Sequence, residues 1–152
     1  MPSEDVQGSP LTILLVEDNL PHVEIVKRAL QAQQIAHRLY HVDDGEAALA
    51  YLFRHEEYAD PATSPRPHVV LLDLHLPKLS GLEVLKAIRA SRELHTMPVV
   101  ILTSSTAERD VVCAYEHHVN SYVVKPVDDA QFSQLLHDLG FYWLNWNYYP
   151  GL

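Results

Sequence analysis

Acidic side chains follow two of the most apolar segments of the chain. LTILLV ends on Glu17 and Asp18, and HVVLL ends on Asp73. Continuous runs of Val, Leu and Ile are typical of strands buried on both faces, as in a parallel sheet. Open parallel sheets bind ligands at the carboxyl ends of their strands, so these carboxylates are expected at a binding edge. A single Asp after a strand more often only accepts hydrogen bonds from turn amides. The residues at the ends of the other strands must therefore decide whether these carboxylates bind a ligand or only stabilise turns.

Two further apolar segments end on groups that could contact a phosphate. MPVVILTSS ends on Thr103 and Ser104, and SYVVKP ends on Lys125. Crowded carboxylates repel and raise one another's pKa unless a cation lies among them, and Mg2+ suits a site with few protein oxygens. An ammonium and a hydroxyl are suitable donors to the oxygens of a transferred phosphoryl group. Together the four strand ends predict a metal-assisted phosphoryl-transfer site, whereas each residue alone has an ordinary structural explanation.

The segments between the apolar runs have the spacing of amphipathic helices. Pro21 suits a first helical position, and HRLYHV is a more polar strand that is expected at an edge or with one exposed face. Stripes of apolar residues predict the buried helix faces, among them Leu49, Leu52 and Phe53 in one helix and Val111, Ala114 and Tyr115 in another. Four pairs are predicted to open helices as capping boxes: Asp43 with Glu46, Ser80 with Glu83, Ser105 with Glu108, and Asp128 with Gln131.

Five strands that alternate with five helices predict an α/β fold, a doubly wound five-stranded parallel sheet with right-handed crossovers over residues 11–139. The length of 152 residues suits one domain, and a net charge of −9 argues against nucleic-acid or membrane partners. The single cysteine, Cys113, fits a reducing compartment, and no apolar stretch is long enough to span a bilayer. We therefore expect a cytoplasmic protein with a disordered tail over residues 1–10, which lack the layout of a secretory signal.

The C-terminal extension, residues 140–152, is rich in large apolar side chains that this domain does not explain. If they were exposed to solvent, four of these side chains would form an apolar patch prone to association: Phe141, Trp143, Leu144 and Trp146. The extension could fold back onto its own sheet. Because Tyr and Trp are enriched in interface cores, a homodimer contact is the sharper hypothesis.

The motifs VEDN, LLDLHLPKLSG, VVILTSS and SYVVKP, in this order and at these spacings, resemble those of the receiver domains of two-component response regulators. The resemblance covers the chain from Leu11 to Leu139 and implies a (βα)5 flavodoxin-like fold. It implies that Asp73 is the phosphoacceptor for a histidine kinase. It further implies that Glu17, Asp18, Asp73 and the backbone carbonyl of His75 hold Mg2+.

The same resemblance assigns the groups around the acceptor. Thr103 and Lys125 become phosphoryl contacts, and Thr103 with Tyr122 becomes a switch that alters a protein–protein surface. The Lys125–Pro126 bond is expected to be cis. The chain departs from the family in having Glu17 where an Asp is usual, and an uncommon His75 two residues after the acceptor.

A narrower resemblance rests on FYWLNWN and on the long loop before the third strand. Both are similar to single-domain response regulators that partner cyanobacterial phytochromes, in which the tail helps to form a homodimer. This resemblance implies a phytochrome histidine kinase as partner. It also implies a phosphoacceptor signalling protein rather than an enzyme, with Mg2+-dependent self-phosphorylation and dephosphorylation only.

Two other classes of protein compete with this hypothesis. One is a constitutive dimeric adaptor that never uses its acidic pocket. The other is a phosphate-ester hydrolase resembling the haloacid dehalogenase family. That family requires a second acidic residue two positions after the first, where this chain has His75. A nucleotide-binding fold is weaker still, because EDNLP after the first strand lacks the glycines that let phosphate approach the backbone.

Overall fold

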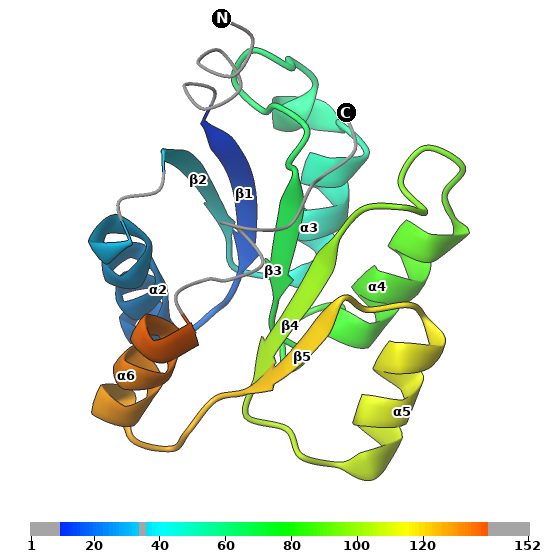
Figure 1. The fold of residues 1–152 in the computed structure, drawn as a ribbon. Helices are drawn as coiled ribbons and strands as arrows, with labels where there is room; N and C mark the ends of the chain where they lie inside the picture. The colour runs from blue at the N-terminus through cyan, green and yellow to red at the C-terminus, as the bar shows by residue number, and fades with distance from the viewer. Residues whose placement is uncertain (1–9, 34–35, 140–152) are drawn as a thin grey trace, which may run out of the picture.

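The computed structural model describes residues 10–33 and 36–139, in which five parallel strands form one sheet with the order β2-β1-β3-β4-β5. Helices cover both faces of the sheet, so the predicted doubly wound α/β fold is confirmed (Figure 1). The strands are β1 Leu11–Val16, β2 His37–Val42, β3 Val69–Leu72, β4 Val99–Thr103 and β5 Ser121–Val124. The helices are α2 Leu20–Ala32, α3 Gly45–Leu52, α4 Gly81–Ala90, α5 Glu108–Glu116, α6 Asp129–Leu139 and the 3-10 helix η1 Glu56–Tyr58.

Two apolar clusters, one on each face of the sheet, make up the core. Along β1, Ile13 and Leu15 pack toward α2 and α6, whereas Leu14 and Val16 pack toward the helices of the other face. Successive strand side chains point to opposite faces, so a continuous apolar run is needed when both faces are covered. This explains why the central strands read as unbroken Val, Leu and Ile, while the edge strand β2, which pairs with β1, is more polar as predicted.

Two of the four predicted helix caps are confirmed. The hydroxyl of Ser80 accepts a bond from the backbone N–H of Glu83 at 3.3 Å and begins α4. The Asp128 carboxylate accepts bonds from the N–H groups of Ala130 and Gln131 at 2.7 and 3.2 Å, ahead of α6. A side-chain acceptor of this kind satisfies a backbone donor that has no partner within the helix.

The other two predicted caps are wrong. Asp44 rather than Asp43 caps α3, by accepting a bond from the backbone N–H of Ala47 at 2.7 Å. Ala107 is the N-cap residue of α5 and makes no side-chain cap. Ser105 instead donates to a carboxylate oxygen of Asp110 at 2.6 Å, because the backbone stays extended through Ala107 and the helix begins only at Glu108.

The predicted buried faces of α3 and α5 are only partly correct. In α5 Ala114 is fully buried, but Val111 is half-buried and Tyr115 is 52% exposed, because α5 lies beside the outer strands β4 and β5 and presents a narrow stripe to the sheet (Figure 1). In α3 Leu52 is buried, but Phe53 lies past the end of the helix and is exposed. The position of α5 beside the sheet and the end of α3 therefore set these differences.

Residues 1–9 and 140–152 lie outside the described part of the chain, so the predicted tail and the aromatic extension stay predictions. Among the described helices, none combines the length and the apolar character needed to cross a bilayer.

The side chain of Arg89 joins the end of α4 to two neighbouring turns. Its Nη1 donates to the carbonyls of His95 and Met97 at 3.1 and 2.7 Å, and its Nε and Nη2 donate to those of His117 and His118 at 2.8 Å each. Carbonyls just past a helix end have no partner within the helix, and those in turns often lack a backbone partner, so one guanidinium here satisfies four acceptors. Arg89 therefore holds α5 in place, although this helix buries few side chains against the sheet.

Replacing Arg89 by Met should lower the free energy of unfolding by about 3 kcal/mol, because hydrogen bonds from a charged donor are lost and carbonyls are left without partners. Urea denaturation measures the change. Arg92→Met, at an exposed position just after the same helix, is the matched control and should stay close to the wild type. Equal stability of the two variants would contradict the assigned role of Arg89.

Candidate functional site

The three predicted carboxylates lie together at the carboxyl edge of the central strands. Val16 of β1 pairs with Leu72 of β3, so the next residues, Glu17 and Asp73, leave the sheet side by side. Carboxylate oxygens of Glu17, Asp18 and Asp73 all lie within 4.8 Å of one another. Glu17 and Asp73 are 2% and 7% exposed, whereas Asp18 is open to solvent. The pocket is thus buried on one side and accessible to a ligand on the other.

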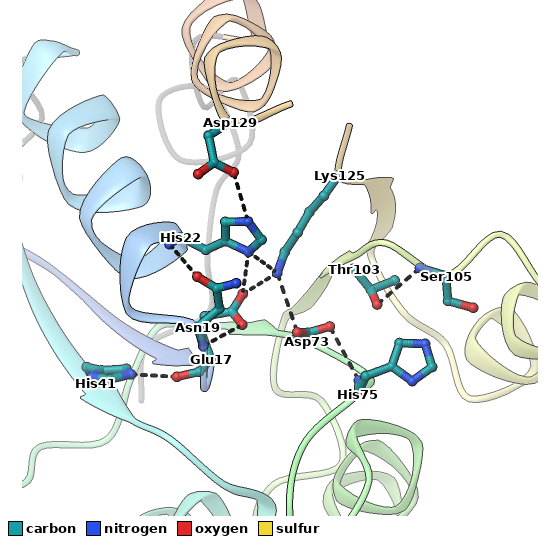
Figure 2. A network of polar contacts seen from close by, with 10 residues as sticks. All are labelled: Glu17, Asn19, His22, His41, Asp73, His75, Thr103, Ser105, Lys125 and Asp129. Carbon is teal, nitrogen blue, oxygen red and sulfur yellow. Dashed lines mark hydrogen bonds and ion pairs between the residues drawn. The ribbon is translucent and has the colours of Figure 1, made fainter. Parts of the chain in front are cut away.

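Lys125 reaches this pocket from the end of β5 (Figure 2). Its Nζ donates to Glu17 Oε1, and it lies 3.4 Å from Asp73 Oδ2. The residue is only 5% exposed, and its backbone N–H donates to the carbonyl of Thr103 at 2.7 Å, which holds the end of β5 beside β4. The sequence prediction that Lys125 faces the carboxylates is therefore correct in its geometry.

The electrostatics of the pocket are dominated by burial. Burial raises the pKa of Glu17 from 4.5 to about 7; Lys125 opposes this rise and Asp73 adds to it. Three carboxylates and one ammonium leave an excess of negative charge when all are ionised. A divalent cation would compensate that excess, and carboxylate oxygens suit Mg2+ or Mn2+. The residues present therefore fit a divalent metal ion.

The backbone after Asp73 also faces the pocket. The N–H of His75 donates to Asp73 Oδ1 at 3.4 Å, while the His75 side chain is exposed. Asp73 Oδ1 and Oδ2 thus have different partners, the first on its own loop and the second on Lys125.

Thr103 and Tyr122 are linked through the backbone of Ser105. The fully buried Thr103 hydroxyl accepts a bond from the N–H of Ser105 at 3.4 Å, and the Tyr122 hydroxyl donates to the Ser105 carbonyl at 2.9 Å. Burial raises the pKa of Tyr122, so its hydroxyl keeps the proton it donates. Within the described residues, no hydrogen bond joins Thr103 to Asp73. The sequence placed both residues near the acceptor but did not show this connection.

Three residues around Glu17 were not predicted as part of the site. The N–H of Asn19 donates to Glu17 Oε2 at 3.2 Å, and the Asn19 side chain caps α2. His41 Nε2 donates to the Glu17 carbonyl at 2.7 Å. His22 Nδ1 lies 3.1 Å from the Lys125 Nζ. The sequence could have indicated Asn19 as a helix N-cap, because it stands just ahead of Pro21. It could not indicate the two histidines, because they reach the site only through tertiary contacts.

The expected cis bond between Lys125 and Pro126 is wrong for this structure, because the peptide bonds of the described residues are all trans. The trans isomer is also the one that X–Pro bonds favour intrinsically.

The chain matches the family model of the response regulator receiver domain over residues 13–137. It is 43% identical to a probable methanogenesis regulatory protein, FilR2 of Methanothrix harundinacea, over 93% of this chain and 89% of that protein. It is 40% identical to response regulator Rcp1 of Synechocystis sp., over 92% of this chain and 93% of that protein.

Two solved structures are also similar. The phosphorylated cyanobacterial phytochrome response regulator RcpA has a TM-score of 0.86 at 36% identity, covering 94% of this chain and all of that one. The Mn2+-bound form of response regulator Rcp1 has a TM-score of 0.86 at 39% identity, covering 93% of this chain and all of that one. Similarity over almost the entire length of each protein includes every strand end that carries a pocket residue.

The raised pKa of Glu17 predicts a pH dependence of stability in the metal-free protein. Between about pH 4.5 and 7 the folded state keeps a proton that the unfolded state has released, so stability falls as pH rises through this window. The fall should reach about 3 kcal/mol, since each unit of pKa corresponds to about 1.4 kcal/mol. Glu17→Gln should remove it. Urea denaturation across this pH window gives the free energy of unfolding of both proteins. Taking the difference between the wild type and Glu17→Gln removes the contribution of the histidines common to both. If the two free energies changed with pH in parallel, the raised pKa of Glu17 would be contradicted.

Proposed function

This chain belongs to the response regulator receiver domain family, and from that membership we propose that it is a phosphorylation-switched signalling protein with Asp73 as its phosphoacceptor. One observation supports the assignment above the others. Asp73 lies at the centre of the pocket, with one oxygen facing Lys125 and with Glu17 and Asp18 beside it. A dimeric adaptor with an unused pocket would not require these groups to converge.

The proposed reaction is a transfer between side chains. A carboxylate oxygen of Asp73 attacks the phosphorus of a phosphohistidine; the O–P bond forms while the P–N bond breaks, and the imidazole leaves with the electron pair. Lys125 stabilises the charge on the phosphoryl oxygens, because its ammonium is already directed at Asp73. The donor supplies the phosphoryl group, so this chain supplies the nucleophile, its position and the compensating charge.

We assign Mg2+ as the ion held by Glu17, Asp18, Asp73 and the backbone carbonyl of His75. When bound, the ion neutralises phosphoryl and carboxylate charge. The acidic cluster supports this assignment, as does the Mn2+-bound form of Rcp1, a similar protein. Because Glu17 shares an oxygen with Lys125, the longer Glu is expected to contact the ion through water.

The proposed switch uses Thr103 and Tyr122. When the Thr103 hydroxyl moves to a phosphoryl oxygen, it leaves the N–H of Ser105, whose carbonyl accepts from Tyr122. The rearranged loop then changes the surface of α5, β5 and α6, on which Val112, Tyr115 and Val124 are exposed. Such a local change biases a protein–protein surface between two states.

The proposed donor is a histidine kinase of the phytochrome type. RcpA, which is 36% identical over 94% of this chain, is a cyanobacterial phytochrome response regulator. This chain is similar to it over the whole receiver domain rather than at the phosphoryl site alone.

Incubation with acetyl phosphate and Mg2+ should add the mass of one phosphoryl group to the intact protein. Asp73→Asn should abolish the addition, because the nucleophilic oxygen is lost. Asp43→Asn is the matched control, since Asp43 also follows a strand of the sheet but is exposed and is not part of the acidic cluster. If intact-mass spectra showed equal labelling of Asp73→Asn and the wild type, the assignment of Asp73 as the phosphoacceptor would be wrong.

The aromatic extension is proposed to make the homodimer through Phe141, Trp143, Leu144 and Trp146, which lie outside the described residues. Truncation after Gly140 should convert a dimer into a monomer in sedimentation velocity, because the apolar contact area is removed. Truncation after Tyr149 keeps these four side chains and should remain dimeric. An unchanged mass after the longer deletion would remove the extension from the interface.

A further inference from the structure

We propose that His22 is a positioning residue for Lys125, an inference that rests on the proposed phosphoacceptor function. His22 lies in the first turn of α2, and its ring lies between two charged groups from the other end of the chain (Figure 2). Its Nδ1 is 3.1 Å from Lys125 Nζ, and its Nε2 is 3.3 Å from Asp129 Oδ1. The imidazole thus joins the pocket lysine to the start of α6.

The two contacts select one form of the ring. An ammonium can only donate, so Nδ1 must be the acceptor in the contact with Lys125. A carboxylate accepts, so Nε2 carries the proton and donates to Asp129. Both requirements are met by the same neutral tautomer, in which the bond made by one nitrogen fixes the role of the other.

Packing holds the ring in this orientation. The Phe132 ring of α6 meets it edge-to-face, with centroids 5.3 Å apart and planes at 76°. The Lys125 Nζ lies over the ring of the same Phe132, 5.8 Å from the ring centroid. His22 and Phe132 therefore leave the lysine side chain little freedom on the side away from the carboxylates.

This position gives the ammonium a third acceptor that carries no negative charge. Lys125 has three N–H donors, and Glu17, Asp73 and His22 lie at the three acceptor positions. Glu17 and Asp73 are also the proposed metal ligands, and the Asp73 carboxylate changes when it is phosphorylated. His22 is the acceptor that neither event removes. We infer that it keeps the ammonium at the pocket while its partners among the carboxylates change.

The first test reads the metal-free protein and does not depend on phosphorylation. Nitrogen-15 NMR of the ring of His22 should show protonated Nε2 and unprotonated Nδ1, and Lys125→Met should shift the Nδ1 resonance. The proposal would be overturned if Nδ1 carried the proton, or if the chemical shift of Nδ1 were unchanged in Lys125→Met. Only the second test requires the wild type to be phosphorylated. A negative result in this first test therefore speaks against the role of His22 and not against the proposed function.

The second test measures the rate at which acetyl phosphate and Mg2+ phosphorylate Asp73. His22→Phe keeps the ring against Phe132 but has no acceptor, and should slow the reaction about tenfold, the value of one hydrogen bond to a charged group. His22→Asn places an oxygen where Nδ1 stood and should stay within about threefold of the wild type.

Two outcomes of this comparison would overturn the role of His22. Full activity of His22→Phe would mean that Lys125 does not need the acceptor. Equal slowing of both variants, with unchanged urea midpoints, would show that an acceptor at this position does not set the rate, since His22→Asn retains one. A wild type that takes no phosphoryl group would reject the proposed function instead.

Discussion

The site depends on one interaction, the buried contact of the Lys125 ammonium with Glu17 and Asp73. Removing one partner from a buried ion pair is costly, because the remaining charge has lost its compensation in a medium of low dielectric. Here burial raises the pKa of Glu17, and Asp73 adds to the rise. The carboxylates also exceed the ammonium in number, so the pocket remains short of positive charge. A divalent cation relieves the same shortage.

The sheet register is what makes this interaction possible. Strand β1 pairs with β3 so that Val16 is opposite Leu72, and β4 pairs with β5 so that Thr103 is opposite Val124. Each functional residue at or just after these pairs is thereby fixed by the backbone hydrogen bonds of the sheet. A slip of one residue would turn the apolar side chains to the wrong faces, so the core that specifies the register also specifies the site.

Long apolar runs and the residues at their ends predicted the fold and the carboxylate pocket, because both follow from local patterns and from the rule that parallel strands end at one edge. The errors have two origins, competing local hydrogen bonds and contacts between elements that are far apart in the sequence. Ser105 does not cap α5 because its hydroxyl bonds to Asp110, and Tyr115 is exposed because α5 covers only the margin of the sheet. His22 joins residues more than a hundred positions away, so no spacing in the sequence could reveal it.

The two sides of the site differ in how tightly they are packed. On the side of α2 and α6, Phe132 is fully buried and His22 is held by contacts with Lys125 and Asp129. On the side of α5, one fully buried residue, Ala114, and the Arg89 side chain hold a helix whose other apolar residues are exposed or half-buried. Elements with few buried contacts move at low free-energy cost. In the proposed switch, a displacement of Thr103 would reach α5 through Ser105, whose backbone N–H donates to Thr103 and whose hydroxyl donates to Asp110.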